Sequence, residues 1–568
     1  MIGLPVGKNK SKLSNKVLAG LVGALALSAI VFSGILPSSS TQQPNYTPQC
    51  PIVEIYRPSS YEENKPVLNK IINDEVFRNE SVKKMQGAVQ IDTSSYDNRP
   101  LDVGANLDQF TQFDEFEDYL SKTFPLFYEN TQLHKVNYHG LVFIWEGTDS
   151  DLKPLLLMGH QDVVPINNDS LSQWDYPPFE AHYDGKYLYG RGSGDCKNLV
   201  IGQLEAAEEL IKTGFKPRRT VIFSYGFDEE ITGIRNQNAQ FIEEIFGAKS
   251  LYAVMDEGGV SLTDSEGVTM AVVGTGEKGY MDLKVSIQKK GGHSSVPQDH
   301  TAIGFMGEII VQIENNKFPT YFTESNPTYW QYMCLAENSV DIDRTLKRDI
   351  LMSKFDETSN KRVRDFINGD RLTSYAIKTT QALDIINGGV KSNALPEYVE
   401  LVINSRVTLE ENIEIAFKKF VYDVKKVASE NNLGLTVNYP SGKTESFNEE
   451  SEIGLLTIEP ITILEPSFVT PVGDAKWKIF AGSLRHVYED LAYPNKDPVL
   501  VTPGLGTGNT DTKLYWNLTD HIYRYRPGVL PSVTANSHGI NEYIEFDGHL
   551  QIIAFTFEYI LSVDAAED

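Results

Sequence analysis

Short apolar segments that end in polar or charged residues recur along the first half of the chain. They begin at residues 141 (LVFIWEG), 154 (PLLLMGH), 220 (TVIFSYGFDEE) and 250 (SLYAVMDEGG). Brief apolar runs of this kind are typical of buried strands. Between them, LVIGQLEAAEELIKTG from residue 199 carries apolar residues at helical spacing and ends in Lys-Thr-Gly, a helix-stop signal. The alternation predicts a mostly parallel α/β sheet from about residue 65 onward.

The pattern changes near residue 280. YMDLKVSIQKK from residue 280 and YVELVINSRVTL from residue 398 alternate apolar and polar positions, as half-exposed strands do, and helical stretches lie between them. After about residue 440 helices and buried strands resume, ending in HLQIIAFTFEYILSV from residue 549. We therefore predict an α/β domain in two sequence parts, 65–279 and 441–568, that is interrupted by an α+β domain at 280–440.

The N-terminus has the pattern of a membrane segment. Residues 17–36, VLAGLVGALALSAIVFSGIL, carry no charge, and four lysines precede them. The length suits a bilayer-spanning helix, whereas the apolar core of a cleaved signal peptide is about 7–15 residues. Lysines on the N-terminal side predict a signal anchor with a cytosolic tail at 1–16, a stalk at 37–64 and a lumenal body. Four sequons on the lumenal side predict N-glycosylation of Asn45, Asn79, Asn168 and Asn517.

Charge and cysteine content narrow the class of protein. The formal net charge is −26, and no basic stripe with interleaved aromatic residues is present, so a nucleic-acid partner is not expected. The three cysteines, Cys50, Cys196 and Cys334, are widely spaced. Such spacing supports neither a disulfide framework nor a thiolate zinc site.

Histidine and acidic residues follow the predicted strands or lie in Gly-rich turns. His160 and Asp162 are two positions apart at the end of a strand, so their side chains should point to the same face. Each residue alone has an ordinary structural reading; Asp195, for instance, could cap a helix. Together they form a nitrogen and oxygen donor set that suits zinc, cobalt or manganese. The other members are Asp195, Glu229, Glu230, Asp256, Glu257 and His538.

These residues belong to seven motifs: GHQDVVP (159–165), GRGSGDCK (190–197), DEE (228–230), DEGG (256–259), GGHSSVP (291–297), GGVKSNALP (388–396) and HGINE (538–542). In this order the motifs resemble the dinuclear-zinc aminoacylase and carboxypeptidase family of metallopeptidases. The resemblance covers most of residues 65–568. With its N-terminal anchor, the chain is most similar to the carboxypeptidase S subgroup, vacuolar enzymes of the Gly-Xaa type.

The resemblance implies a zinc-exopeptidase-like catalytic domain with an inserted ferredoxin-like lid at 280–440. Asp195 would bridge two zinc ions, with cobalt or manganese as alternatives. Asp162 would orient His160, and Glu229 would be the general base. One ion would be completed by His160 and Asp256, with Glu257 as the rival, and the other by Glu230 and His538. The resemblance also implies substrate contacts by His293, Asn393, Arg406 and Thr510.

The implied function is a membrane-anchored carboxypeptidase that removes C-terminal residues from short peptides in a vacuole or lysosome, with homodimerisation through the lid. Two alternatives stay open from the sequence. The same site could hydrolyse or synthesise N-acyl amino acids, because these substrates are also amides that carry a free carboxylate. The chain could also be an inactive lumenal binding protein, although the intact ligand set with Glu229 argues against this.

Overall fold

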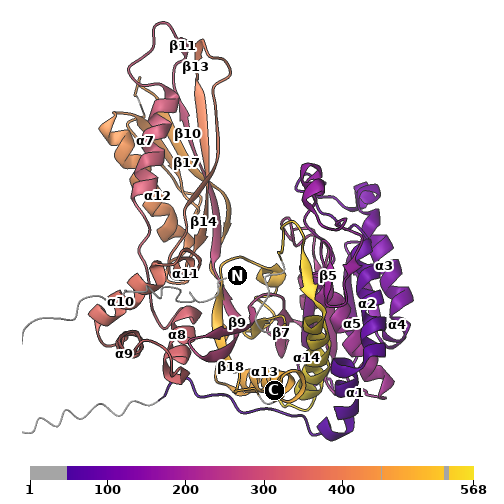
Figure 1. Ribbon diagram of the computed structural model, residues 1–568. Coiled ribbons are helices and arrows are strands. Elements are labelled where there is room, and N and C mark those ends of the chain that lie inside the picture. Colours follow the sequence, from indigo (N-terminus) through magenta and orange to yellow (C-terminus); the bar gives the residue numbers. More distant parts are fainter. Residues whose placement is uncertain (1–47, 450, 495, 530–535) are drawn as a thin grey trace, which may run out of the picture.

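The computed structural model describes residues 48–449, 451–494, 496–529 and 536–568. Its larger part is built on a nine-stranded sheet with the order β1-β2-β6-β3-β7-β19-β9-β18 and with β8 beside β9 (Figure 1). The strands are β1 (Gln132–Val136), β2 (Gly140–Trp145), β3 (Leu155–His160), β6 (Val221–Gly226), β7 (Ala253–Asp256), β8 (Val260–Ser265), β9 (Val268–Glu277), β18 (Leu500–Gly506) and β19 (Ile522–Arg524). All four of the predicted apolar strands are present as β2, β3, β6 and β7.

The prediction of a mostly parallel sheet is right for half of its eight strand pairs. The pairs β3–β6, β3–β7, β7–β19 and β9–β18 are parallel, whereas β1–β2, β2–β6, β8–β9 and β9–β19 are antiparallel. Short hairpins account for part of the difference. Glu266 and Gly267, both at positive φ, form the two-residue turn between β8 and β9, and a turn this short forces an antiparallel pair.

Helices cover both faces of this sheet. One face packs against a layer of helices with α5 at its centre. The helix α5 contacts the sheet, α2 and α14 and is buried along most of its length. The helix α6 covers part of the other face. The predicted helices at 199 and 549 are confirmed as α5 and α14. The bounds are α1 (Tyr61–Asn73), α2 (Glu75–Gln90), α3 (Thr111–Thr123), α4 (Pro125–Asn130), α5 (Lys197–Lys212), α6 (Asn238–Phe246), α13 (Ala475–His486) and α14 (Phe546–Asp564).

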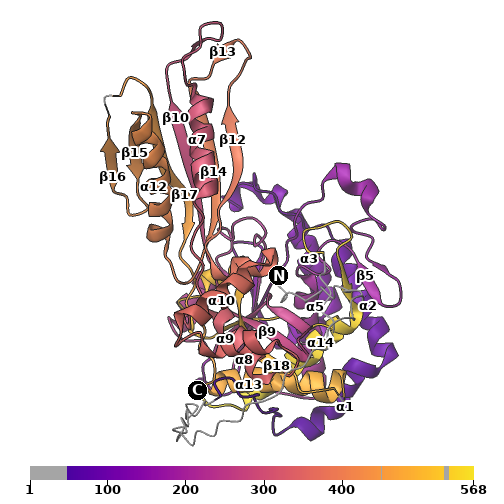
Figure 2. The same cartoon turned by 60° about the vertical axis from the view of Figure 1, so that its left-hand side comes forward.

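A second sheet stands apart from the first, and two helices cover one of its faces (Figure 2). Its six strands have the order β12-β14-β10-β17-β15-β16. Alternate residues of β14 are buried, which confirms the predicted half-exposed strand. We call this unit the lid sheet. Its elements are β10 (Gly279–Gln288), α7 (Ala302–Asn315), β12 (Ala382–Gly388), β14 (Tyr398–Val407), α12 (Ile413–Glu430), β15 (Gly434–Asn438), β16 (Thr444–Phe447) and β17 (Leu455–Leu464).

Sheet membership differs from the expected segment of 280–440 in two places. The strand β17 pairs with β10 and β15, so the lid sheet extends past residue 440. Between α7 and β12 the chain leaves the lid sheet and packs helices against β9 and β18 of the nine-stranded sheet. We call this segment the helical insert: α8 (Pro327–Asn338), α9 (Arg344–Met352), α10 (Glu357–Asn368), α11 (Arg371–Ser374) and the 3₁₀ turn η3 (Tyr375–Ile377). The division into folding units stays a prediction.

A disulfide joins Cys50 to Cys334 in the insert helix α8. From the spacing we expected no disulfide framework, and this single bond was not predicted, since a sequence separation of 284 residues leaves no local signal. The remaining cysteine, Cys196, is buried as a free thiol.

We expect Cys334→Ser to lower the free energy of unfolding by about 2–5 kcal/mol, because the bond restricts a very long loop in the unfolded chain. Urea titration of the variant and of the reduced wild type should give the same loss. Thiol titration of the unreduced, denatured wild type should find Cys196 alone; three reactive thiols would contradict the bond.

Part of the N-terminal prediction lies outside the described residues: the cytosolic tail, the anchor at 17–36, the first part of the stalk and Asn45. Within the ranges that the structure describes, no helix has the length and apolarity needed to cross a bilayer.

Candidate metal centre

Acidic and histidine side chains gather at one edge of the nine-stranded sheet. The parallel strands β3, β6 and β7 lie side by side, so their carboxyl ends meet at this edge. His160 is the last residue of β3, Glu229 and Glu230 follow β6, and Glu257 follows β7. Ligands of open α/β sheets bind at this position.

Asp195 lies at the middle of the cluster, in the turn before α5. Its Oδ1 is 3.3 Å from Nε2 of His160, and its Oδ2 is 3.3 Å from Nε2 of His538. Each imidazole also faces a second carboxylate: Glu257 Oε1 is 3.2 Å from His160 Nε2, and Glu230 Oε2 is 2.9 Å from His538 Nε2. The result is two histidine–carboxylate pairs that share one aspartate.

The donor atoms fit a metal centre. One candidate ligand group is Asp195, Glu230 and His538, whose ligand atoms lie within 4.8 Å of one another. Glu230 Oε1 is buried and, among the described residues, accepts no hydrogen bond. Burial, and then the Asp195 carboxylate, raise the pKa of Glu230 to about 7 against the opposing bond from His538. A divalent cation would supply the missing partner and the missing positive charge.

Cys196 is also close to His160. His160 donates its backbone N–H to Cys196 Sγ at 3.3 Å. Burial first, and then Glu257, raise the pKa of the thiol well above its ordinary value. His160, Cys196 and Glu257 form a second candidate ligand group, whose ligand atoms lie within 4.8 Å of one another.

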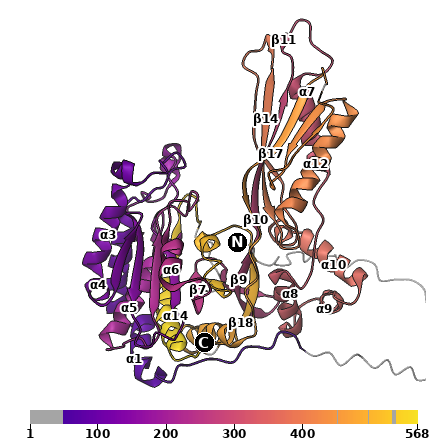
Figure 3. The ribbon, with the colours of Figure 1, turned by 180° about the vertical axis from the view of Figure 1, so that it is seen from behind.

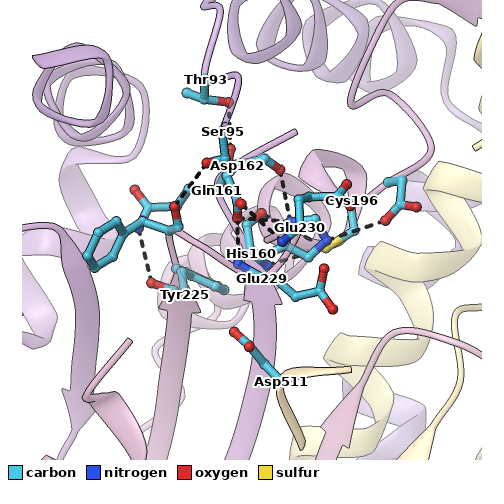
Figure 4. Close-up of polar contacts among 12 residues, drawn as sticks. Thr93, Ser95, His160, Gln161, Asp162, Cys196, Tyr225, Glu229, Glu230 and Asp511 are labelled. Carbon is cyan, nitrogen blue, oxygen red and sulfur yellow. Dashed lines mark hydrogen bonds and ion pairs between the residues drawn. The ribbon is translucent and has the colours of Figure 1, made fainter. Parts of the chain in front are cut away.

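Asp162 contacts His160 and the turn that carries Glu229 and Glu230 (Figure 4). Its backbone carbonyl accepts from Nδ1 of His160 at 2.9 Å, and its Oδ1 is 3.5 Å from the same nitrogen. The two carboxylate oxygens accept the backbone N–H groups of Glu229 and Glu230 at 3.2 and 3.1 Å. Asp162 thus fixes both the ring of His160 and the turn that carries the two glutamates.

Glu229 lies beside His160 in the same view (Figure 4). Burial first, and then the carboxylates of Glu257 and Asp511, raise its pKa well above the ordinary value. A raised pKa suits a residue that must take up a proton near neutral pH and release it again.

The geometry separates Glu257 from Asp256. Glu257 reaches His160, whereas no contact joins His160 to the side chain of Asp256, which is buried at the end of β7. Gly258 and Gly259 turn the chain directly after Glu257, both at positive φ.

Glu542 closes the HGINE motif that contains His538 and contacts the turn of Asp195, and the sequence interpretation gave it no role. Its fully buried carboxylate accepts the backbone N–H groups of Gly194 and Asp195 at 2.8 and 3.0 Å and pairs with Arg191 at 2.7 Å. It therefore ties the loop of His538 to the turn of Asp195.

Glu542→Ala would leave the buried Arg191 guanidinium and two backbone N–H groups without this acceptor. We expect the free energy of unfolding to fall by about 3–5 kcal/mol, and the zinc affinity to fall with it. The matched control is Glu545→Ala in the strand β20 (Tyr543–Glu545). The Glu545 carboxylate is 3.4 Å from the exposed Lys186, so its loss should cost at most about 1 kcal/mol. Equal losses for the two variants in urea denaturation would contradict this role.

The four residues expected to contact the substrate lie at two separate sites. Arg406 lies at the base of β14, where its Nη1 donates to Asn509 at 2.9 Å and its guanidinium lies 4.6 Å from the centre of the Tyr280 ring. Thr510 follows Asn509, and its hydroxyl contacts that of Thr512 at 2.7 Å.

His293 and Asn393 lie at the other end of the lid sheet. They lie at the small antiparallel pair of β11 (Gly292–His293) and β13 (Ala394–Leu395), far from β7 in both views (Figures 1 and 3). His293 is exposed and bonds to Ser295. The structure does not bring these two residues to the metal cluster of the same chain.

The remaining glycosylation candidates, Asn79, Asn168 and Asn517, are all exposed.

The chain is similar to known proteins over most of its length. A model of peptidase family M20/M25/M40 matches residues 156–562. Carboxypeptidase S of Saccharomyces cerevisiae is 39% identical over 99% of this chain and 100% of its own length. The N-fatty-acyl-amino acid synthase/hydrolase PM20D1 of Mus musculus is 28% identical over 85% of this chain and 88% of its own.

Among solved structures, the di-peptidase Dug1p from Saccharomyces cerevisiae matches with a TM-score of 0.57 at 14% identity, over 89% of this chain and 99% of that one. The metallo-carboxypeptidase Sso-CP2 from Sulfolobus solfataricus matches with a TM-score of 0.55 at 16% identity, over 85% of this chain and 99% of that one. At these identities the two structures show a shared fold.

Proposed function

The chain belongs to peptidase family M20/M25/M40, and from that premise we propose that it is a dizinc metallocarboxypeptidase. It releases C-terminal amino acids from short peptides of the Gly-Xaa type. One observation carries the proposal: the Asp195 carboxylate lies between two histidine–carboxylate pairs, with Glu229 beside them.

The two proposed ions differ in their ligands. His160 and Glu257 hold one, Glu230 and His538 hold the other, and Asp195 is shared. We choose Glu257 over Asp256 because only Glu257 contacts His160. Zinc bound to such a set supplies an acidified water and polarises the scissile carbonyl. Cobalt or manganese would suit the same nitrogen and oxygen donors.

Glu229 carries the proton in this scheme. It takes the proton from the attacking water and passes it to the nitrogen of the leaving amino acid. Asp162 keeps Glu229 in place through the backbone N–H bond and keeps the Nε2 of His160 directed at the site.

Arg406 recognises the free carboxylate of the substrate. Among the described residues, the bond to Asn509 is the single hydrogen bond that its guanidinium nitrogens make, so the planar fork keeps donors for a carboxylate. His293 and Asn393 lie too far away to act within one chain. In this proposal they act on the site of a second copy, in a homodimer formed through the lid sheet, and Thr510 contributes to the pocket beside Arg406.

The surroundings of the enzyme are also part of the proposal. The uncharged run at 17–36 anchors the chain with its body in the lumen of the vacuole or lysosome. Asn45, Asn79, Asn168 and Asn517 are the glycosylation acceptors on that side.

Hydrolysis or synthesis of N-acyl amino acids is the second candidate, and the similarity to PM20D1 favours it. Its substrates carry the same amide and the same carboxylate, so neither the proposed metal centre nor Arg406 distinguishes the two activities.

Release of leucine from an N-blocked Gly-Leu dipeptide by the full-length chain tests the proposal. The parallel substrate is a long-chain N-acyl leucine, and both reactions are repeated after chelation and after zinc is restored. We expect zinc-dependent release from the dipeptide. Release from the N-acyl leucine alone would establish the second candidate, and bound zinc without either activity would reject both.

A further inference from the structure

A cavity of about 200 Å³ lies next to the metal centre. It is bordered by the turn after β7, by the end of β18 and by residues of β9 and β19. Its lining includes Gly258, Gly259, Tyr332, Ala376, Leu505 and Asn509.

Two glycines connect the cavity to the reacting centre. Gly258 and Gly259 follow Glu257 at φ values of 114° and 67°, where L side chains are rarely accommodated. A Cβ on Gly259 would also come within 2.6 Å of the carbonyl oxygen of Val272. The tight turn lets the chain leave Glu257 without a side chain between the centre and the cavity.

The proposed carboxylate receptor borders the opposite side. Asn509 and Thr510 line the cavity, and Asn509 accepts the hydrogen bond from Arg406. Consider a substrate whose carboxylate is bound by Arg406 and whose scissile amide lies at the metal centre. Its C-terminal residue joins these two groups and therefore lies across the cavity.

The helical insert closes the cavity. Tyr332 of α8 and Ala376 of η3 belong to a segment that lies between two lid-sheet elements in sequence but packs on the nine-stranded sheet in space. The wall is thus fixed to the same sheet as the metal centre.

The cavity suits an uncharged side chain. Of the described residues that line it, Glu277 and Arg524 are charged, and they pair with each other at 3.1 Å while both are buried. Arg524 also donates to Thr512 at 2.9 Å. The remaining lining residues carry no charge. Val260, Val272, Ala376 and Leu505 are apolar, and the others are glycines or uncharged polar residues such as Tyr332. A charged occupant would have to break the ion pair or stay unpaired.

We propose that this cavity is the specificity pocket for the side chain of the released C-terminal residue, and that it selects apolar side chains of about leucine size. The inference rests on the proposed carboxypeptidase function. Pockets for whole drug-sized ligands are about 300–1,000 Å³, so a smaller cavity fits one part of a substrate, such as a single side chain.

Two variants of the full-length protein test the pocket in opposite directions. Ala376→Leu narrows it, and Leu505→Ala widens it. The substrates are N-blocked Gly-Ala, Gly-Leu and Gly-Trp, with the blocking group held constant, and the measured quantity is the ratio of kcat/KM between two substrates. The control is Tyr375→Leu, an exposed neighbour on the same 3₁₀ turn that does not line the cavity.

We expect Ala376→Leu to lower the Leu/Ala ratio by about 10-fold or more, which is the effect of a methylene-sized change in an apolar pocket. Leu505→Ala should raise the Trp/Leu ratio, and Tyr375→Leu should keep both ratios. A second series keeps C-terminal leucine and varies the blocking group from acetyl to decanoyl.

The outcomes separate failure of the pocket from failure of the proposed function. Ratios that stay constant in both pocket variants, while the wild type releases every C-terminal residue, would overturn the pocket and leave the carboxypeptidase intact. Ratios that instead follow the blocking group would assign the cavity to the amino side of the bond and overturn the inference. No release by the wild type from any substrate would reject the proposed function itself.

Discussion

Replacing Glu229 with Gln is expected to lower kcat for peptide hydrolysis by about 10³-fold, with zinc content unchanged. The amide has the shape of the carboxylate but cannot take up a proton from water. The fold of the turn should persist, because the backbone N–H of residue 229 still donates to Asp162 and Glu230 keeps its own bond. Steady-state kinetics and metal analysis of the same preparation measure the two quantities.

The neighbouring Glu230→Gln is the matched control. Glu230 faces His538 at 2.9 Å, so its loss should reduce zinc content as well as activity. The distances also allow Glu229 to join His160 and Glu230 in a ligand group. A Glu229→Gln variant that loses zinc would therefore make Glu229 a ligand and remove it from the role of base.

Asp195→Asn is expected to give the second large effect. The proposed bridge needs both carboxylate oxygens, one towards His160 and one towards His538. An amide offers one oxygen, so zinc content should fall from two ions to one or fewer per chain. Activity should fall by roughly 10³–10⁴-fold, since metal activation supplies several kcal/mol of the barrier reduction.

Two further variants serve as controls for Asp195→Asn. His538→Ala should lose the ion of the Glu230 pair and retain the other, while Asp169→Asn, an exposed acid, should keep both ions and full activity. Retention of both ions by Asp195→Asn would show that the aspartate is not shared between them.

The candidate site residues at the ends of strands could be predicted from the sequence. His160 and Asp162 have the i, i+2 spacing that places side chains on one face, and the apolar strand before them is visible as a pattern. In the structure His160 Nε2 lies 3.3 Å from Asp195, and the Asp162 carboxylate accepts the backbone N–H of Glu230.

The choice between Asp256 and Glu257 could not be made in this way. Consecutive strand residues point to opposite faces, so only one of the two can face His160. Which one depends on the residue at which β7 ends and on the turn at Gly258 and Gly259, and neither is encoded in the local pattern.

Contacts between segments that are distant in sequence also could not be predicted from the sequence. Glu542 meets Gly194 across 348 positions, and the helical insert returns to the first sheet from within the lid segment. The apolar pattern of the insert predicts helices but does not name the surface against which they pack.

The bond between Cys50 and Cys334 makes a covalent ring of the first part of the protein. His160, Asp195, Glu229, Glu230 and Glu257 all lie within this ring, and His538 lies outside it. A protease that nicks any surface loop between the two cysteines produces a two-chain molecule with unchanged mass on a non-reducing gel. Maturation by such nicking would become visible only after the sample is reduced, when two shorter bands replace one.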